Sequence, residues 1–181
     1  ASSLALDEWF QKHFSYRFVR VELLETALTH ISYGGAGKEN YERLEFLGDA
    51  VLDWMVCRIG FHKNADATPA DMHIYKEWLV NNNMLGLQLI MHGGELIHRI
   101  RCSSSIQAQV HSYVSKVKRA LPLHSLESLQ QLLYTVECPK LLGDVLEAMI
   151  AAVFVDTNYS LTRTWEVFVC PLFGSILAQS K

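Results

Sequence analysis

Apolar residues recur at helical spacing along most of this chain. Between residues 21 and 29, for example, Leu23, Leu24, Ala27 and Leu28 fall on one face of a helix. No stretch shows the persistent alternation of apolar and polar residues that marks a half-buried strand. The pattern therefore predicts an all-α fold. The expected helices cover residues 6–13, 21–29, 40–60, 69–82, 83–91, 106–119, 125–136, 143–156, 161–168 and 171–179, with a short helix or turn at 95–101.

Residues with special backbone preferences mark several helix ends. Asn40 is expected to cap the helix at 40–60. Pro69 suits the first turn of the helix that follows it. Gly93 and Gly94 indicate the end of the helix at 83–91, and the glycines between residues 33 and 38 indicate a loop.

Length and composition indicate one globular domain. The chain has 181 residues, of which 50% are hydrophobic and 19% charged. No apolar run approaches the roughly 18 residues that a membrane helix needs, so no membrane association is expected. The start Ala-Ser-Ser-Leu has neither Met nor a basic segment, so we interpret the chain as a fragment of a larger protein. Four isolated cysteines favour reduced thiols in an intracellular compartment, cytoplasmic or nuclear, with an organelle not excluded.

Acidic residues form a stripe on the helix expected at 40–60. Glu42, Glu45, Asp49 and Asp53 lie at i, i+3, i+7 and i+11 and therefore share one face. Like charges one turn apart destabilise a helix by roughly 0.2–0.5 kcal/mol per pair, so a bound cation would relieve them. A solvated acidic face, partnered by nearby basic residues, is the alternative interpretation.

A second pair of carboxylates lies about a hundred residues later. Asp144 and Glu147 share a face of a helix that is otherwise strongly apolar. Buried carboxylates are rare unless they are paired or bind metal. In each of the two helices a glycine directly precedes the aspartate. Two helices that each carry such a pair predict a site for a hard divalent cation, Mg²⁺ or Mn²⁺, which prefers oxygen ligands.

Four sequence motifs resemble those of the ribonuclease III family, in the order in which that family carries them. The resemblance is closest to the second ribonuclease III domain of Dicer-type enzymes, which share Tyr16-Arg17-Phe18, Thr68-Pro69 and Pro139-Lys140. The four motifs are LTHISY at residues 28–33, the signature ERLEFLGDAVL at 42–52, LVNN at 79–82 and KLLGDVLEA at 140–148. The resemblance implies one catalytic domain over residues 1–181, with an insertion at about 102–138.

The resemblance also implies an activity and its ligands. The domain would be a double-stranded-RNA-specific endoribonuclease in which Glu45, Asp49, Asp144 and Glu147 bind Mg²⁺, with Mn²⁺ as a substitute. Two metal ions would hydrolyse the phosphodiester and leave 5′-phosphate ends with short 3′ overhangs. Such domains work in pairs, either as a homodimer or with another ribonuclease III domain. The alternative is a catalytically inactive relative that serves as a structural or RNA-binding partner.

Four further residues have two interpretations each. Lys140 either assists catalysis, as in Dicer-type domains, or forms an ion pair with Asp144 or Glu147. Glu42 would support the metal ligands without binding metal, or pair with a cation. Asn82 would order water or RNA backbone, or form hydrogen bonds at a helix end. Phe46 would pack into the partner at a dimer interface, or belong to the core of its own domain.

Charge complicates the expected binding of RNA. The formal net charge is −3, whereas phosphate contacts require Lys and Arg. Basic residues cluster locally, at Arg99 and Arg101 and at Lys116, Lys118 and Arg119. Those of the 102–138 insertion are either a solvated surface or a contact for RNA or for other parts of a larger protein.

Overall fold

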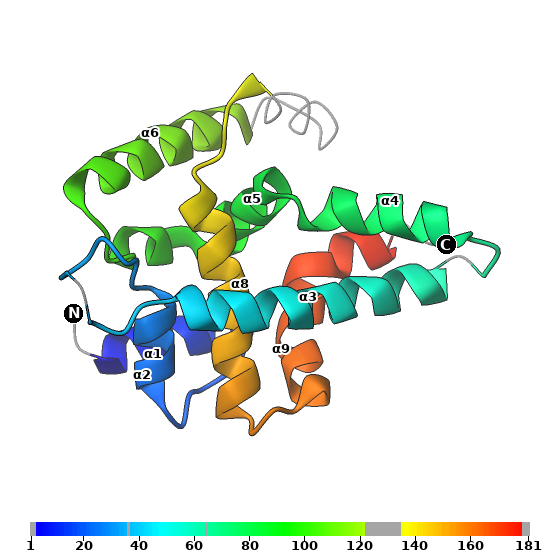
Figure 1. Ribbon diagram of the computed structural model, residues 1–181, viewed down its shortest axis with the longest axis horizontal. Helices are drawn as coiled ribbons and strands as arrows, with labels where there is room; N and C mark the ends of the chain where they lie inside the picture. The colour runs from blue at the N-terminus through cyan, green and yellow to red at the C-terminus, as the bar shows by residue number, and fades with distance from the viewer. Residues whose placement is uncertain (1–2, 36, 64, 122–134, 179–181) are drawn as a thin grey trace.

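Helix α8, Lys140–Asp156, runs through the centre of the fold (Figure 1). The computed structural model of the chain describes residues 3–35, 37–63, 65–121 and 135–178. Every residue of α8 from Leu141 to Val153 is buried, as expected of a helix that is apolar on nearly all sides. It contacts α2, α3, α5 and α9. The two acidic residues Asp144 and Glu147 therefore lie in a helix that the rest of the chain encloses.

The surrounding elements confirm the all-α prediction. Within the described ranges there is no strand, only an isolated bridge between Thr29 and Arg101. The other helices are α1 Ser3–Phe14, α2 Val21–Ala27, α3 Glu42–Lys63, α4 Pro69–Val80, α5 Asn82–Gly93, the 3-10 helix η1 Gly94–Arg99, α6 Ser104–Ala120 and α9 Leu161–Ala178.

Local sequence explains several helix ends. The Asn40 side chain accepts a hydrogen bond from the Glu42 amide at 2.9 Å, at the start of α3. Thr68 and Asp71 form a reciprocal capping box around Pro69 at the start of α4. Asn81 has an extended backbone that separates α4 from α5, and its side chain accepts a hydrogen bond from the Met84 amide. The predicted break between these helices is therefore confirmed to within one or two residues.

The C-terminal region differs from the prediction. The sequence predicts two helices here, at 161–168 and 171–179, and a proline inside a helix lacks an amide proton and clashes with the preceding turn. Instead α9 continues through Pro171. Buried residues on both sides of the proline, Phe168 and Leu172 among them, keep one face of α9 in the core. The helix expected at 125–136 lies mostly outside the described residues.

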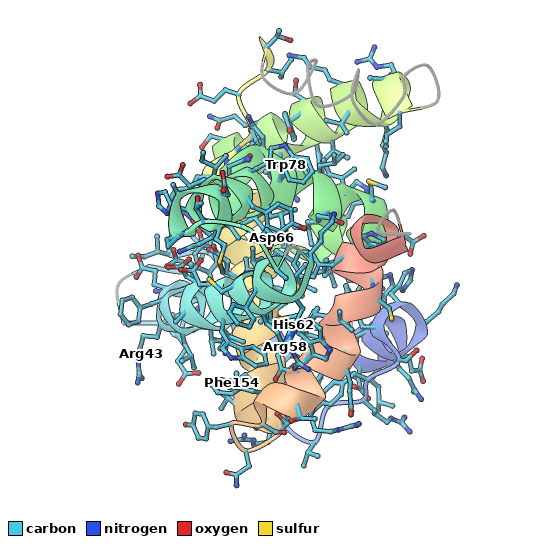
Figure 2. The ribbon with its side chains drawn as sticks, turned by 90° about the vertical axis from the view of Figure 1, so that its right-hand side faces the viewer. Arg43, Arg58, His62, Asp66, Trp78 and Phe154 are labelled. Atoms are coloured by element: carbon cyan, nitrogen blue, oxygen red, sulfur yellow. The ribbon has the colours of Figure 1, made fainter. Side chains whose placement is uncertain are left out.

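Helix α3 lies across α8 and contacts α4 and α9 as well (Figure 1). Its outer surface carries Arg43, which points away from the neighbouring helices (Figure 2). On the α9 side, the Arg58 guanidinium lies 4.3 Å from the ring centre of Trp165 and 5.6 Å from that of Trp54. This stacking joins α3 to α9.

The structure also bears on membrane-spanning helices and on the state of the cysteines. Among the described residues, no helix is long and apolar enough to cross a membrane. All four cysteines lie in the described ranges, and all four are free thiols.

Candidate metal centre

Helices α3 and α8 approach each other closely at the point where both carry carboxylates. A Cβ atom added to Gly48 of α3 would lie 1.8 Å from the Glu147 carbonyl oxygen of α8. One added to Gly143 of α8 would lie 2.5 Å from the Asn82 side-chain oxygen. Gly48 therefore lets α8 approach α3, which brings the two acidic stretches together, whereas Gly143 lets α5 approach α8.

Three of the four predicted metal ligands converge at this crossing. Carboxylate oxygens of Glu45, Asp144 and Glu147 all lie within 4.8 Å of one another. Asp144 and Glu147 are 8% and 9% exposed, and Glu45 is partly buried. Asp49 is exposed and lies outside this group, although its charge still acts on Glu147. We call Glu45, Asp144 and Glu147 the acidic cluster.

Electrostatics at the cluster are unfavourable for a fully ionised state. The pKa of Glu147 is raised to about 8, mainly because burial removes the carboxylate from water. The negative charges of Asp49, Asp144 and Glu45 raise this pKa further, and Lys140 partly opposes them. At neutral pH and without metal, Glu147 therefore retains a proton.

Lys140 pairs with the acidic cluster. Its Nζ donates to Asp144 Oδ1 at 2.5 Å and lies 3.7 Å from Glu45 Oε1. The hydrogen bond to Asp144 is the main reason why the pKa of Lys140 is raised. Of the two partners considered for an ion pair, the structure places Asp144 in contact. The side chain is 74% exposed, so Lys140 also faces solvent.

Tyr41 is a site residue that the sequence did not reveal. Its hydroxyl donates to Asp144 Oδ2 at 2.9 Å, and the ring is buried. Burial and the Asp144 charge both raise the pKa of this phenol, which therefore stays protonated. Tyr41 lies one turn before Glu45, so helical spacing could have placed it beside the acidic stripe. It directly precedes the signature motif, and no charge marks it as part of the stripe.

The remaining predicted residues lie at the edge of the centre or away from it. Glu42 is exposed and outside the acidic cluster. The Asn82 amide donates to the Cys138 carbonyl at 2.9 Å, which supports the hydrogen-bonding interpretation. Asp53, the last carboxylate of the stripe, pairs with Lys76 of α4. Phe46 is 82% exposed, so the alternative of a core phenylalanine is wrong.

The donor set fits a hard divalent cation. All three side chains of the acidic cluster offer carboxylate oxygens, and no His or Cys of the described residues joins them. Mg²⁺ and Mn²⁺ prefer such oxygen ligands, whereas zinc sites usually include nitrogen or sulfur. The geometry and the electrostatics together make this cluster able to hold a metal ion.

Comparison with known proteins identifies relatives that match most of this chain in sequence. The chain is 30% identical over 178 residues to Endoribonuclease Dicer homolog 3 of Arabidopsis thaliana, and the match covers 98% of this chain and 10% of that protein. It is 31% identical over 170 residues to Endoribonuclease Dcr-1 of Drosophila melanogaster, covering 89% of this chain and 7% of that protein. The chain thus spans about a tenth or less of these relatives.

A solved structure and a family model agree with these sequence relatives. The nuclease domain of ribonuclease III from Campylobacter jejuni superimposes with a TM-score of 0.68 at 27% identity, covering 92% of this chain and 96% of that domain. That domain shows structural flexibility in a region involved in dimer formation. The family model of the ribonuclease III domain matches residues 42–158, which include all three residues of the acidic cluster. The chain belongs to the ribonuclease III family.

Proposed function

We propose that this chain is a metal-dependent endoribonuclease domain that hydrolyses double-stranded RNA. The observation that carries the proposal is the convergence of Glu45, Asp144 and Glu147 at the α3–α8 crossing of a ribonuclease III domain. The relatives named above are endoribonucleases by their names. RNA duplexes would be recognised by shape and by their 2′-hydroxyl groups, since a protein cannot read bases in the deep groove of A-form RNA.

The acidic cluster and Asp49 would hold the metal. When bound there, Mg²⁺ or Mn²⁺ would supply an activated water and neutralise charge on the attacking and leaving oxygens. Glu147 must release the proton that it retains at neutral pH before it can act as a ligand. Tyr41 would hold Asp144 in place, because its buried hydroxyl donates to Oδ2, whereas the partner of Oδ1 is the largely exposed Lys140.

Lys140 is placed to act on the substrate. Its ammonium donates to Asp144 Oδ1 and would be released from that oxygen if Asp144 bound a metal ion there. The side chain is long and largely exposed, so it can turn toward the scissile phosphate and stabilise the charge that builds up there. Water attack at phosphorus with departure of the 3′ oxygen leaves a 5′-phosphate and a 3′-hydroxyl.

We also propose that the domain acts as one half of a pair. Phe46 is 82% exposed on α3 within the signature motif, and the resemblance to the ribonuclease III family implies that this side chain packs into the partner domain. The partner is a second copy or another ribonuclease III domain of a longer protein. Two offset cuts, one per domain, would give short 3′ overhangs.

Cleavage of an RNA duplex labelled on both strands tests the proposal. In Mg²⁺ the wild-type chain should cut both strands, and Asp49→Ala and Glu147→Ala should each abolish cutting. Asp53→Asn is the matched control, since Asp53 is a carboxylate on α3 that pairs with Lys76 outside the acidic cluster. Absence of cleavage by a folded, metal-loaded dimer would favour the inactive-partner alternative.

A second readout does not depend on turnover. Millimolar Mg²⁺ or Mn²⁺ should raise the thermal midpoint of the wild-type chain, because metal binds the folded state alone. The same addition should have little effect on Glu147→Ala. An unchanged midpoint in the wild type would contradict the proposed metal centre.

A further inference from the structure

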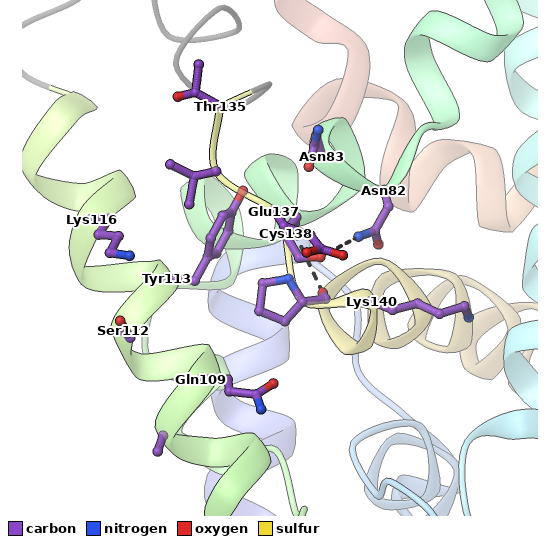
Figure 3. Close-up of a pocket in the computed structure, with 13 residues that line it drawn as sticks. Asn82, Asn83, Gln109, Ser112, Tyr113, Lys116, Thr135, Glu137, Cys138 and Lys140 are labelled. Atoms are coloured by element: carbon purple, nitrogen blue, oxygen red, sulfur yellow. Dashed lines mark hydrogen bonds between the residues drawn. The ribbon is translucent and has the colours of Figure 1, made fainter.

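A groove lies beside the acidic cluster, between helix α6 and the first turn of α8 (Figure 3). Its volume is about 1060 Å³. Three segments line it: one side of α6, the beginning of α5 and residues 135–140. The family motifs of the chain use only its edge, at Asn82 and Lys140.

The lining of the groove mixes apolar side chains with polar ones that offer both donors and acceptors. Lys116 of α6 lies on one wall, and Lys140 lies at the opposite end (Figure 3). Between them are the neutral side chains of Asn83 and Gln109 and the carboxylate of Glu137. Two cations at the ends suit phosphate groups. Neutral polar groups and one carboxylate, which only accepts hydrogen bonds, suit the hydroxyl groups of a sugar.

Helix α6 contributes a basic surface to a chain whose net charge is negative. Its sequence contains three basic residues, Lys116, Lys118 and Arg119, and no acidic residue. The opposite face of α6 is buried through Val110, Tyr113, Val114 and Val117, which fixes the orientation of the polar face. Lys116 is exposed, and no carboxylate of the described residues forms an ion pair with it.

The groove is continuous with the acidic cluster through one residue. Lys140 lines the groove and also donates to Asp144. A nucleic-acid strand with one phosphate at the acidic cluster would therefore have its neighbouring nucleotides over the groove. A groove with a cation at each end matches such a polymer better than it matches a small molecule.

We infer that this groove holds the ribose–phosphate backbone of the RNA strand next to the phosphate that is cut. Lys116 contacts a phosphate, and Glu137 accepts a hydrogen bond from a ribose 2′-hydroxyl, a donor that DNA lacks. The inference rests on the proposed function, and it assigns the basic surface of α6 to RNA and not to another protein segment. It predicts that α6 sets both affinity and the preference for RNA.

Binding measured without cleavage tests this inference. The full 181-residue chain, with Ca²⁺ in place of Mg²⁺, is titrated into a fluorescent RNA duplex and anisotropy is recorded. Lys116→Ala should weaken binding by roughly five- to tenfold and reduce the slope of log affinity against log salt by about 0.9, the contribution of one phosphate contact. Lys118→Ala is the matched control, because it removes the same charge two residues away and outside the groove. It should change affinity less than about twofold.

A second variant tests the sugar contact. The wild-type chain should bind RNA more tightly than the same duplex with 2′-deoxy residues in one strand. Glu137→Gln should reduce this preference, because a neutral amide oxygen is a weaker hydrogen-bond acceptor than a carboxylate. Equal effects of Lys116→Ala and Lys118→Ala, with the RNA preference unchanged in Glu137→Gln, would overturn the inference and leave α6 as a contact for protein.

The two proposals fail separately. If the chain never cleaves RNA but Lys116→Ala still weakens binding and Lys118→Ala does not, the groove inference stands and the proposed activity falls. If the chain cleaves RNA and Lys116→Ala binds as the wild type does, the activity stands and the groove inference falls.

Discussion

Both carboxylate oxygens of Asp144 have a hydrogen-bond donor, and each donor comes from a different part of the chain. Tyr41 donates to Oδ2 and Lys140 donates to Oδ1. The tyrosine is buried and fixed, whereas the lysine is long and largely exposed. A metal ion can therefore displace Lys140 while Tyr41 keeps the carboxylate oriented. Partners of metal ligands often set their orientation and basicity in this way.

Removal of the Tyr41 hydroxyl should impair the site without unfolding the protein. In Tyr41→Phe the ring still fills its buried position, but Asp144 loses one fixed donor. We expect Mg²⁺ affinity or RNA cleavage to fall by roughly 10- to 100-fold, as for other partners of metal ligands. Tyr75→Phe is the control, because the Tyr75 hydroxyl is buried and has no hydrogen-bond partner in the described structure. Equal activity of the two variants would show that Tyr41 does not position Asp144.

The raised pKa of Glu147 predicts a pH dependence of the metal-free protein. The folded state binds this proton more tightly than the unfolded state, in which the pKa is close to the ordinary value of 4.5. Stability should therefore fall as pH rises from about 4.5 to 8 and then level off. In EDTA, the thermal midpoint of Glu147→Gln should fall less over this range than that of the wild type.

A control variant separates this effect from other titrations. Glu42→Gln removes an exposed carboxylate that lies outside the acidic cluster, and its curve of midpoint against pH should run parallel to that of the wild type. If the Glu147→Gln curve were also parallel to the wild-type curve, Glu147 would be ionised in the folded metal-free protein at neutral pH, and the burial argument would be wrong.

At the residue scale, the sequence identified the carboxylates of the site more readily than the uncharged residue that contacts them. The spacing placed Asp144 and Glu147 on one face of a helix, and the resemblance to the ribonuclease III family supplied the prediction that Glu45 joins them. The spacing was not sufficient for Tyr41, since a phenol before a motif carries no pattern until the partner helix is in place. Nor could the spacing separate Asp49, which is exposed, from the three carboxylates of the acidic cluster.

At the scale of elements, one glycine decides how closely α3 and α8 approach. In Gly48→Ala the new methyl group would lie 1.8 Å from the Glu147 carbonyl oxygen. Because this atom belongs to the backbone of a buried helix, the two helices must move apart. Overpacking of this kind typically costs about 1–3 kcal/mol, and here we expect the upper end or beyond. Chemical denaturation of the purified variant would measure the loss.

Gly174→Ala is the matched control for this prediction. It adds the same methyl group to a glycine of α9, where, among the described residues, no atom beyond the chain neighbours and the adjacent helix backbone lies within 4 Å of the new Cβ. Helix propensity favours alanine, so stability should stay the same or rise by up to about 1 kcal/mol. Equal stability of the two variants would mean that α3 and α8 can separate at little cost, and that Gly48 does not fix the metal centre.

The spacing of apolar residues and the capping residues predicted the order of the helices. They did not predict where α8 begins or that α9 is uninterrupted. Pro171 predicts a break from local chemistry alone, yet α9 continues because residues before and after it pack in the same core. Similarly, α8 begins at Lys140, earlier than glycine at position 143 suggested. Tertiary packing overrides local preference at both places, and a single sequence does not display that packing.

At the scale of the whole molecule, the negative net charge and the proposed polyanionic substrate are reconciled by location. The acidic cluster lies at the α3–α8 crossing, where a metal would neutralise its carboxylates. The charged residues of α6, in contrast, are all basic. Affinity for RNA should nevertheless be modest, since few cations are available for phosphate contacts. The match covers only 10% of the Arabidopsis relative, which leaves ample length for further RNA contacts in a protein of that kind.

The proposed pairing of domains makes a prediction about Phe46. An apolar side chain that is 82% exposed in one chain would be buried in the pair, and central aromatic anchors of this kind dominate interfaces. Phe46→Gln should weaken the dimer by at least roughly 30-fold, which corresponds to about 2 kcal/mol. Val19→Gln, at an apolar residue that is 87% exposed elsewhere on the surface, should leave the dimer unchanged. Sedimentation over a range of concentrations measures both constants.

The same measurement distinguishes the two kinds of pairing. Suppose that the wild-type chain dimerises and that Phe46→Gln loses both the dimer and the cleavage of two strands. This result would support a homodimer that forms through α3. A wild-type chain that stays monomeric at every concentration would exclude the homodimer and require another ribonuclease III domain as the partner. A dimer that is indifferent to Phe46→Gln would mean that the pair forms through a different surface, because an exposed phenylalanine at the centre of an interface cannot be replaced by a polar side chain without cost.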